Sequence, residues 1–169
     1  MKIVAIRIDS RLIHGQTANL WHGYWGCDRF MVIDDETAND PNMKSIMKLA
    51  APNGVKVSIL DQETAIKYLL EPNHYGNEKI TIIVKDLEPI KALVENNIPF
   101  DCEVIVGQML MGEGREIGVG LEVAKHIRCS QKDIEIFHWL DEKGVKLFTQ
   151  VTPQMNRDEF MKQLAAVEK

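Results

Sequence analysis

Residues 2–25, KIVAIRIDSRLIHGQTANLWHGYW, contain the pattern that decides the fold. Residues 2–8 form a short run rich in β-branched side chains, which predicts a β-strand. A polar segment follows, and Gly15–Trp25 is rich in Ala, Leu and Trp, which predicts an α-helix. The opening unit is therefore a strand, a loop and a helix.

The same unit recurs along the chain. Residues 29–33 predict a second strand, residues 34–40 an acidic loop, and residues 41–50 a helix with proline in its first turn. Alternation of this kind predicts a parallel sheet, with a glycine-rich interruption at residues 107–120. Further strands are expected at residues 56–60, 79–84, 102–106, 124–129 and 145–149, and further helices at residues 62–70, 87–95, 131–143 and 156–167.

Length and composition favour one domain over residues 1–169, because 169 residues can bury a hydrophobic core unaided. Charged residues at 27% and hydrophobic residues at 45% are ordinary for a soluble globular protein. A net charge of −5 without a long basic run argues against nucleic acid and anionic membrane surfaces as partners. The three cysteines are widely spaced, which predicts reduced thiols rather than a zinc site.

The start of the chain does not resemble a signal peptide or a membrane span. Its apolar stretch is broken by Arg7 and Asp9 and is too short for either role. Any membrane association is therefore expected to go through a partner.

The loop after the first strand carries the candidate chemistry, because ligands of open α/β sheets bind outside the carboxyl ends of the strands. It reads Asp9-Ser10-Arg11-Leu12-Ile13-His14-Gly15-Gln16 and ends where a helix begins. A helix N-terminus attracts an anion, and Arg11 can hold phosphoryl oxygens with two donors. His14 can accept and release a phosphoryl group as a phosphoramidate without a metal or another cofactor. Asp9 could bond a ring nitrogen of His14 or tether Arg11, and the sequence leaves both open.

Bland interpretations compete with each of these residues. His14 could simply pack in a polar loop while Arg11 and Asp9 form a surface ion pair worth little. Asp34 and Asp35 follow the second strand and could suggest a magnesium site, but capping and turn roles are preferred, and a weaker hypothesis has them tether Arg11 or shape a partner contact. No metal site is therefore predicted.

Two other features of the sequence invite a functional interpretation that we do not adopt. The glycines of residues 107–120 do not match a nucleotide-binding motif. Trp21 and Trp25 lie one helical turn apart, and we expect both to be buried rather than to form a sugar-stacking platform.

A family resemblance raises the odds of the phosphate interpretation. IRIDSRLIHGQ (residues 6–16) closely resembles the segment around the phosphorylated histidine in IIB components of the mannose/sorbose-type sugar phosphotransferase system. VIDDETANDPNMKSIMKLAAPNGVKVSIL (residues 32–60) and DIEIFHWLDEKGVKLF (residues 133–148) resemble two further blocks of that family, so most of the chain is covered.

The resemblance implies a fold, a function and partners. The family has a three-layer α/β/α arrangement around a mainly parallel open sheet, here of six to seven strands. His14 would accept phosphate from a phosphohistidine on the IIA component and pass it to a sugar held by the membrane components IIC and IID. Arg11 would stabilise the phosphate, with Ser10, Gly15 and Gln16 in the phosphate-binding loop. The chain would be cytoplasmic and peripheral at the membrane through IIC and IID, and it would need no cofactor.

Two departures from the family pattern lie close to the candidate site. Members usually have Asp-Asp or Asp-Glu where this chain has Asp9-Ser10, and a Val-Gly-Gly-Met turn where it has Val106-Gly107-Gln108-Met109. Gly107 and Gln108 are expected to flank His14, and the added Gln108 side chain leaves partner and substrate preference open. Two other functions remain alternatives: a regulatory binding module on the same fold, and a small enzyme using His14 as acid or base. The chain could also form a homo-oligomer.

Overall fold

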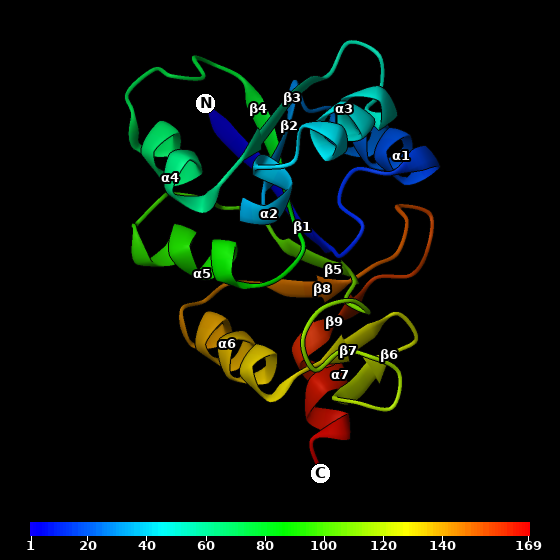
Figure 1. The fold of residues 1–169 in the computed structure, drawn as a ribbon. Helices are drawn as coiled ribbons and strands as arrows, with labels where there is room; N and C mark the ends of the chain where they lie inside the picture. The colour runs from blue at the N-terminus through cyan, green and yellow to red at the C-terminus, as the bar shows by residue number, and fades with distance from the viewer.

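The computed structural model describes residues 1–169 and has a seven-stranded sheet at its centre (Figure 1). The strand order is β3-β2-β4-β1-β5-β8-β9, and every neighbouring pair is parallel except β8 and β9. The sheet strands are β1 (Lys2–Asp9), β2 (Arg29–Ile33), β3 (Lys56–Leu60), β4 (Lys79–Val84), β5 (Val104–Gln108), β8 (Leu147–Thr149) and β9 (Asp158–Glu159). The predicted α/β class and mainly parallel sheet are confirmed.

Helices cover both faces of this sheet. They are α1 (Gly15–Trp25), α2 (Asp35–Ala38), α3 (Pro41–Ala50), α4 (Gln62–Leu70), α5 (Glu88–Glu95), α6 (Gln131–Glu142) and α7 (Phe160–Val167). Side chains alternate along each strand, so β2 sends Phe30 and Val32 into a small core with α1 and α3. Met31 and Ile33 of the same strand enter a larger core with α4, α5, α6 and α7. Helices on both faces make the arrangement three-layered, as Figure 1 shows.

Three predicted segments differ from the structure in more than their ends. Residues 124–129 are not one strand: β6 (Leu121–Ala124) and β7 (Ile127–Cys129) form a separate antiparallel hairpin, whose turn lacks the Gly or Pro that would have marked it. The acidic loop 34–40 contains the short helix α2, because the Asp34 side chain caps it. The final segment begins with β9, which pairs with β8, so its helix starts only at Phe160.

The remaining differences are shifts at the ends of elements. Strand β5 runs over Val104–Gln108 rather than 102–106, because its last residue still pairs with Asp9 of β1. Strand β8 begins at Leu147, α5 begins at Glu88, and α6 ends at Glu142 with Gly144 following in a left-handed conformation. No helix has the length and apolar character needed to cross a membrane.

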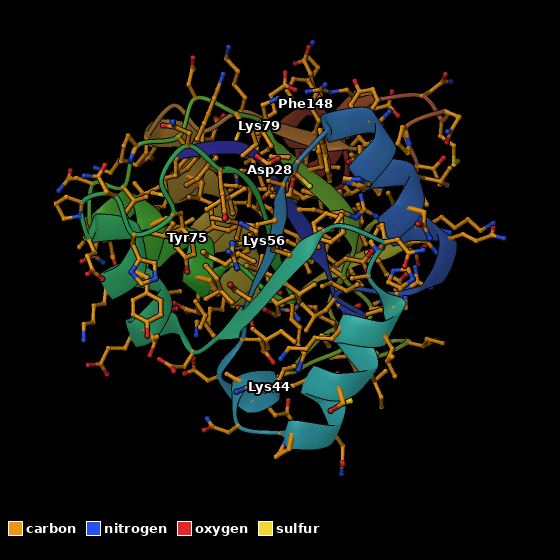
Figure 2. The ribbon with its side chains drawn as sticks, turned by 90° about the horizontal axis from the view of Figure 1, so that it is seen from above. Asp28, Lys44, Lys56, Tyr75, Lys79 and Phe148 are labelled. Carbon is orange, nitrogen blue, oxygen red and sulfur yellow. The ribbon has the colours of Figure 1, made fainter.

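The two ends of the sheet have different roles. At the amino end, Asp28 joins the starts of two strands: its carboxylate accepts from the Lys79 amide at 2.7 Å and its carbonyl accepts from the Lys56 amide at 3.0 Å (Figure 2). At the carboxyl end, β1 leads to α1 on one face, while its neighbour β4 leads to α5 on the other. Adjacent strands whose connections leave on opposite faces open a crevice where α/β proteins bind ligands.

Candidate functional site

Strand β1 carries two charged residues into the interior at its carboxyl end. Ile6 and Ile8 enter the larger core, so the alternate positions, Arg7 and Asp9, face the side covered by α1. Arg7 is 3% exposed and Asp9 is 1% exposed. Charged groups this deeply buried are found almost only where they are paired.

The loop between β1 and α1 turns sharply and ends on His14. The Leu12 amide donates to the Asp9 carbonyl at 2.8 Å, and Leu12 adopts a left-handed φ of 58°. Such a conformation costs a non-glycine residue about 1–3 kcal/mol, which the burial of Leu12 in the smaller core offsets. His14 is the extended N-cap residue of α1, and its side chain does not cap the helix. The histidine ring is thus left half-buried at the helix N-terminus.

Asp9 is the centre of this site. Its Oδ2 lies 3.2 Å from His14 Nε2 and 3.1 Å from Arg7 Nη2. Its Oδ1 accepts from the Arg11 amide at 3.1 Å, with Arg11 Nε 3.6 Å away. Both alternatives left open by the sequence are therefore present, since Asp9 contacts the His14 ring and also Arg11.

The protonation of Asp9 follows from these contacts. Burial alone would raise its pKa, but the hydrogen bond with His14 and the charge of Arg7 outweigh burial and lower the pKa below its ordinary value. A carboxylate can only accept a hydrogen bond, so His14 Nε2 is the donor in this contact, and His14 Nδ1 forms no hydrogen bond. The ring is therefore held with one nitrogen free.

Sequence reasoning gave Arg7 no role in the site. Arg7 Nη1 donates to the Gln150 carbonyl at 3.0 Å, Nη2 donates to the Val151 carbonyl at 3.2 Å, and the guanidinium lies 4.9 Å from the centre of the Trp21 ring. Burial lowers the pKa of Arg7, and the nearby Asp9 carboxylate opposes that effect. A charged residue inside an apolar central strand was the signal that could have identified it.

Gly107 and Gln108 lie directly beside this network. A Cβ at Gly107 would lie 2.2 Å from Arg7 Nη2, so only glycine fits below the guanidinium. Gln108 pairs with Asp9 across β1 and β5, and its carbonyl accepts from the Ser10 amide at 2.9 Å. The loop after β5 thus starts in contact with the loop that carries His14.

The other predicted loop residues differ in exposure. Ser10 is buried, and its Oγ has no hydrogen-bond partner. Gly15 and Gln16 are exposed in the first turn of α1. The Arg11 side chain is 47% exposed, with no carboxylate nearer than the 3.6 Å contact to Asp9, so it is free to reach an anion bound beside His14.

Asp34 has the capping role preferred from the sequence, whereas Asp35 binds the start of a distant helix, α4. Asp34 accepts from the Thr37 amide at 2.8 Å and pairs with Lys85 at 2.9 Å, while Asp35 accepts from the Gln62 amide at 2.8 Å. Neither contacts Arg11. No cluster of three or more His, Cys, Asp or Glu side chains is arranged to hold a metal ion.

The expectation of two buried tryptophans was half wrong. Trp21 is 2% exposed, and its Nε1 donates to the Val151 carbonyl at 3.3 Å. Trp25 stacks on Trp21 with ring centroids 4.3 Å apart but stays half-buried, because it lines an open groove beside β1 and β5.

Comparison with known proteins gives one consistent match. The family model described as "PTS system sorbose subfamily IIB component" matches residues 3–169. The sorbose-specific EIIB component of Lacticaseibacillus casei is 32% identical over 147 residues, which cover 87% of this chain and 85% of the relative. The fructose-specific EIIB component of Bacillus subtilis is 29% identical over 169 residues, covering 100% and 99%.

Solved structures agree with the sequence matches. The crystal structure of the IIB domain of the sorbose permease from Klebsiella pneumoniae superposes with a TM-score of 0.89 at 25% identity, covering 98% of both chains. A structure described as a phosphoenolpyruvate-dependent phosphotransferase system protein gives a TM-score of 0.86 at 30% identity and covers 99% of both chains.

Proposed function

The chain belongs to the sorbose subfamily of phosphotransferase-system IIB components, and from that premise we propose that His14 is the residue that carries its phosphoryl group. As a IIB component the protein is a phosphoryl carrier for sugar uptake, in a family that works with IIA and with IIC and IID. The observation that carries the proposal is the 3.2 Å contact between Asp9 Oδ2 and His14 Nε2 at the start of α1.

The contact with Asp9 supports Nδ1 of His14 as the nucleophile. Because Asp9 accepts the Nε2 proton, the lone pair of His14 lies on Nδ1, which attacks the phosphorus of phospho-IIA. The Nδ1–P bond forms as the bond between phosphorus and the donor histidine breaks, and the donor ring leaves as a free imidazole. No water or metal ion is needed, since catalysis of this step rests on positioning and charge.

Positive groups surround the place where the phosphoryl group would sit. The amides of Gly15, Gln16 and Thr17 precede the first helical hydrogen bond of α1, which runs from the Ala18 amide to the His14 carbonyl at 3.3 Å. Arg11 is free to add a planar pair of donors to the same oxygens. These donors would hold the equatorial oxygens during transfer in either direction.

Delivery to the sugar uses the same atoms in reverse. A sugar hydroxyl held by IIC and IID would attack the phosphorus, and the Nδ1–P bond would break. The accepting hydroxyl releases its proton to solvent water in that step, and the electrons of the broken Nδ1–P bond return to Nδ1 as its lone pair. We place this exchange at the cytoplasmic side of the membrane, with the IIB chain held there only through its partners.

The experiment that tests the proposal is incubation with phosphorylated IIA followed by intact-mass analysis. The wild type should gain one acid-labile phosphoryl group, and His14→Ala should gain none. His22→Ala is a matched control, since His22 lies on the same helix, and it should be phosphorylated normally. Undiminished phosphorylation of His14→Ala would overturn the assignment.

A further inference from the structure

The glycine-rich loop, defined as residues 110–120, exposes three apolar side chains at once. Met111 is 62% exposed, Ile117 is 96% exposed and Val119 is 50% exposed. Scattered exposed apolar residues are normal, but several on one short segment indicate a contact surface. The activity of His14 does not require this segment to be apolar.

A buried ion pair fixes the shape of the loop. Arg115 donates to Asp133 twice at 2.9 Å, and its Nη1 donates to the Met111 carbonyl at 2.7 Å. Asp133 belongs to the capping box of α6, where it also accepts from the Ser130 amide at 2.8 Å. Burying two charges costs free energy unless their geometry is good, so this pair commits the loop to one conformation.

The C-terminal end of the loop, at Gly120, is also held in one conformation by close packing. Gly120 has a φ of 72°, and a Cβ there would lie 2.2 Å from the Gly114 carbonyl oxygen. The backbone at Gly114 and the backbone at Gly120 are therefore in close contact, which only glycine permits. Arg128 Nη1 then donates to the Gly120 carbonyl at 3.1 Å. The exposed side chains of Met111, Ile117 and Val119, which we call the tip, therefore belong to a loop with one fixed conformation.

The loop starts at the end of the sheet where phosphate is exchanged. It follows Gln108, whose carbonyl accepts from the Ser10 amide at 2.9 Å. Figure 1 shows the segment that joins β5 to β6 at the end of the sheet where β1 and β5 finish. A protein that exchanges a phosphoryl group with His14 approaches this end of the molecule.

The negative charge of the loop and of the whole chain limits the kinds of partner that can bind the tip. Glu113 and Glu116 lie in the same loop, are exposed and form no ion pair, in a chain with a net charge of −5. A second copy of this chain and an anionic lipid surface would both be repelled. The cytoplasmic loops of membrane proteins carry an excess of Lys and Arg. Their positive charge complements Glu113 and Glu116, which lie in the same loop as the tip.

We propose that the tip formed by Met111, Ile117 and Val119 docks on the cytoplasmic loops of the membrane-embedded partner that holds the sugar. This inference rests on the proposed function and adds to it a separate surface for the second half of the relay. IIA would then bind His14 without using the tip.

The test measures transfer from phospho-IIA to His14 and transfer from His14 to the sugar separately in the variant Ile117→Ser. Ile117 is 96% exposed, so this substitution leaves the core intact. Transfer from phospho-IIA to His14 should keep its wild-type rate. Sugar phosphorylation by vesicles containing IIC and IID should show a KM for the IIB chain raised about tenfold, with kcat unchanged. Leu70→Ser is the matched control, because Leu70 is 53% exposed at the end of α4, and it should change neither step.

Each other outcome contradicts the inference. An unchanged KM with vesicles would show that the tip touches no membrane partner. An equal loss in transfer from IIA would assign the tip to IIA, and a change in oligomeric state would assign it to a second copy. Loss of phosphorylation in His14→Ala tests the proposed function separately, so failure of one proposal does not hide failure of the other.

Discussion

At the scale of single residues, Arg7 explains how the proposed phosphate site can contain a carboxylate. Asp9 orients His14, but an isolated buried carboxylate would repel an incoming phosphoryl group. Arg7 lies 3.1 Å from Asp9 and offsets its charge. Arg7 itself is held by the Gln150 and Val151 carbonyls, so it remains paired with Asp9 whether or not phosphate is present. In the proposed site, Arg11 is then the cation left to bind phosphate.

Asp9→Asn should weaken both folding and transfer. The amide keeps the shape of the side chain but leaves Arg7 buried without a counter-ion, and removal of one partner of a buried pair costs about 3–5 kcal/mol. Denaturant unfolding should show this loss, and rapid-quench phosphorylation should show transfer slower by about 100-fold, because the His14 ring loses its fixed tautomer. Asp35→Asn, at an exposed carboxylate away from Arg7, should leave the transfer rate unchanged.

Gly107→Ala tests the packing beneath Arg7. The new Cβ would lie 2.2 Å from Arg7 Nη2, so the guanidinium must move and take Asp9 with it. Overpacking of this kind costs about 1–3 kcal/mol, and phosphotransfer should slow as well. Gly23→Ala is the control, since nothing lies within 4 Å of its added Cβ and α1 should gain slightly in stability. Equal behaviour of the two variants would contradict the packing argument.

Sequence alone identified part of this site. Asp9, Arg11 and His14 fall in one short loop before a predicted helix, so their proximity follows from chain order. Arg7 was visible as a charge in an apolar run, but its partners at Gln150 and Val151 are more than 140 residues away in the chain. Contacts of that range depend on the order of strands in the sheet, which local patterns do not determine.

At the scale of elements, regular βα units were predictable and irregular connections were not. The strand Lys79–Val84 and the helix Pro41–Ala50 were predicted with the bounds they have, because periodicity and end signals agree there. The β6–β7 hairpin and β9 were missed, since their pairing is set by contacts outside the local sequence. Arg115 likewise fixes the glycine-rich loop through Asp133, which lies on α6.

Arg115→Ala should release the glycine-rich loop. Asp133 would remain buried without its partner, which costs about 3–5 kcal/mol in the free energy of unfolding. Limited proteolysis should then cut within residues 110–120 before the rest of the chain unfolds. Lys132→Ala is the control, because it removes an exposed ion pair between Lys132 of α6 and Glu88 of α5 and should leave stability nearly unchanged. A loop that stays protease-resistant in Arg115→Ala would contradict the anchoring role.

At the scale of the whole molecule, the two ends of the sheet differ. Ion pairs of Glu78 join strands at the amino end, and the proposed site lies at the carboxyl end. The carboxyl end presents His14, while at the amino end Glu78 binds Arg29 Nε at 2.6 Å and Lys56 Nζ at 2.5 Å. The hydrogen bond with Arg29 is the main cause that lowers the pKa of Glu78 to about 2. This clamp joins the starts of β2 and β3 to the segment before β4.

Glu78→Gln should reveal the clamp through the pH dependence of stability. A carboxylate whose pKa is lowered by folding from 4.5 to about 2 stabilises the fold fully above 4.5, and that stabilisation is lost as pH falls through about 2. The variant should therefore be less stable at pH 7 by about 1–2 kcal/mol, and the difference should shrink between pH 4.5 and pH 2. Urea unfolding measures this difference, with Glu159→Gln, an exposed pair with Lys162, as a nearly neutral control. A difference that is constant with pH would contradict the clamp.

The central claim is that Asp9 holds His14 Nε2 and so leaves Nδ1 to carry the phosphoryl group. The most direct test is ¹⁵N and ³¹P NMR of the ¹⁵N-histidine-labelled protein after phosphorylation by IIA. The account predicts a phosphorus coupling to Nδ1 of His14, with Nε2 still protonated and hydrogen-bonded to Asp9. A phosphoryl group on Nε2, or on another histidine, would contradict it.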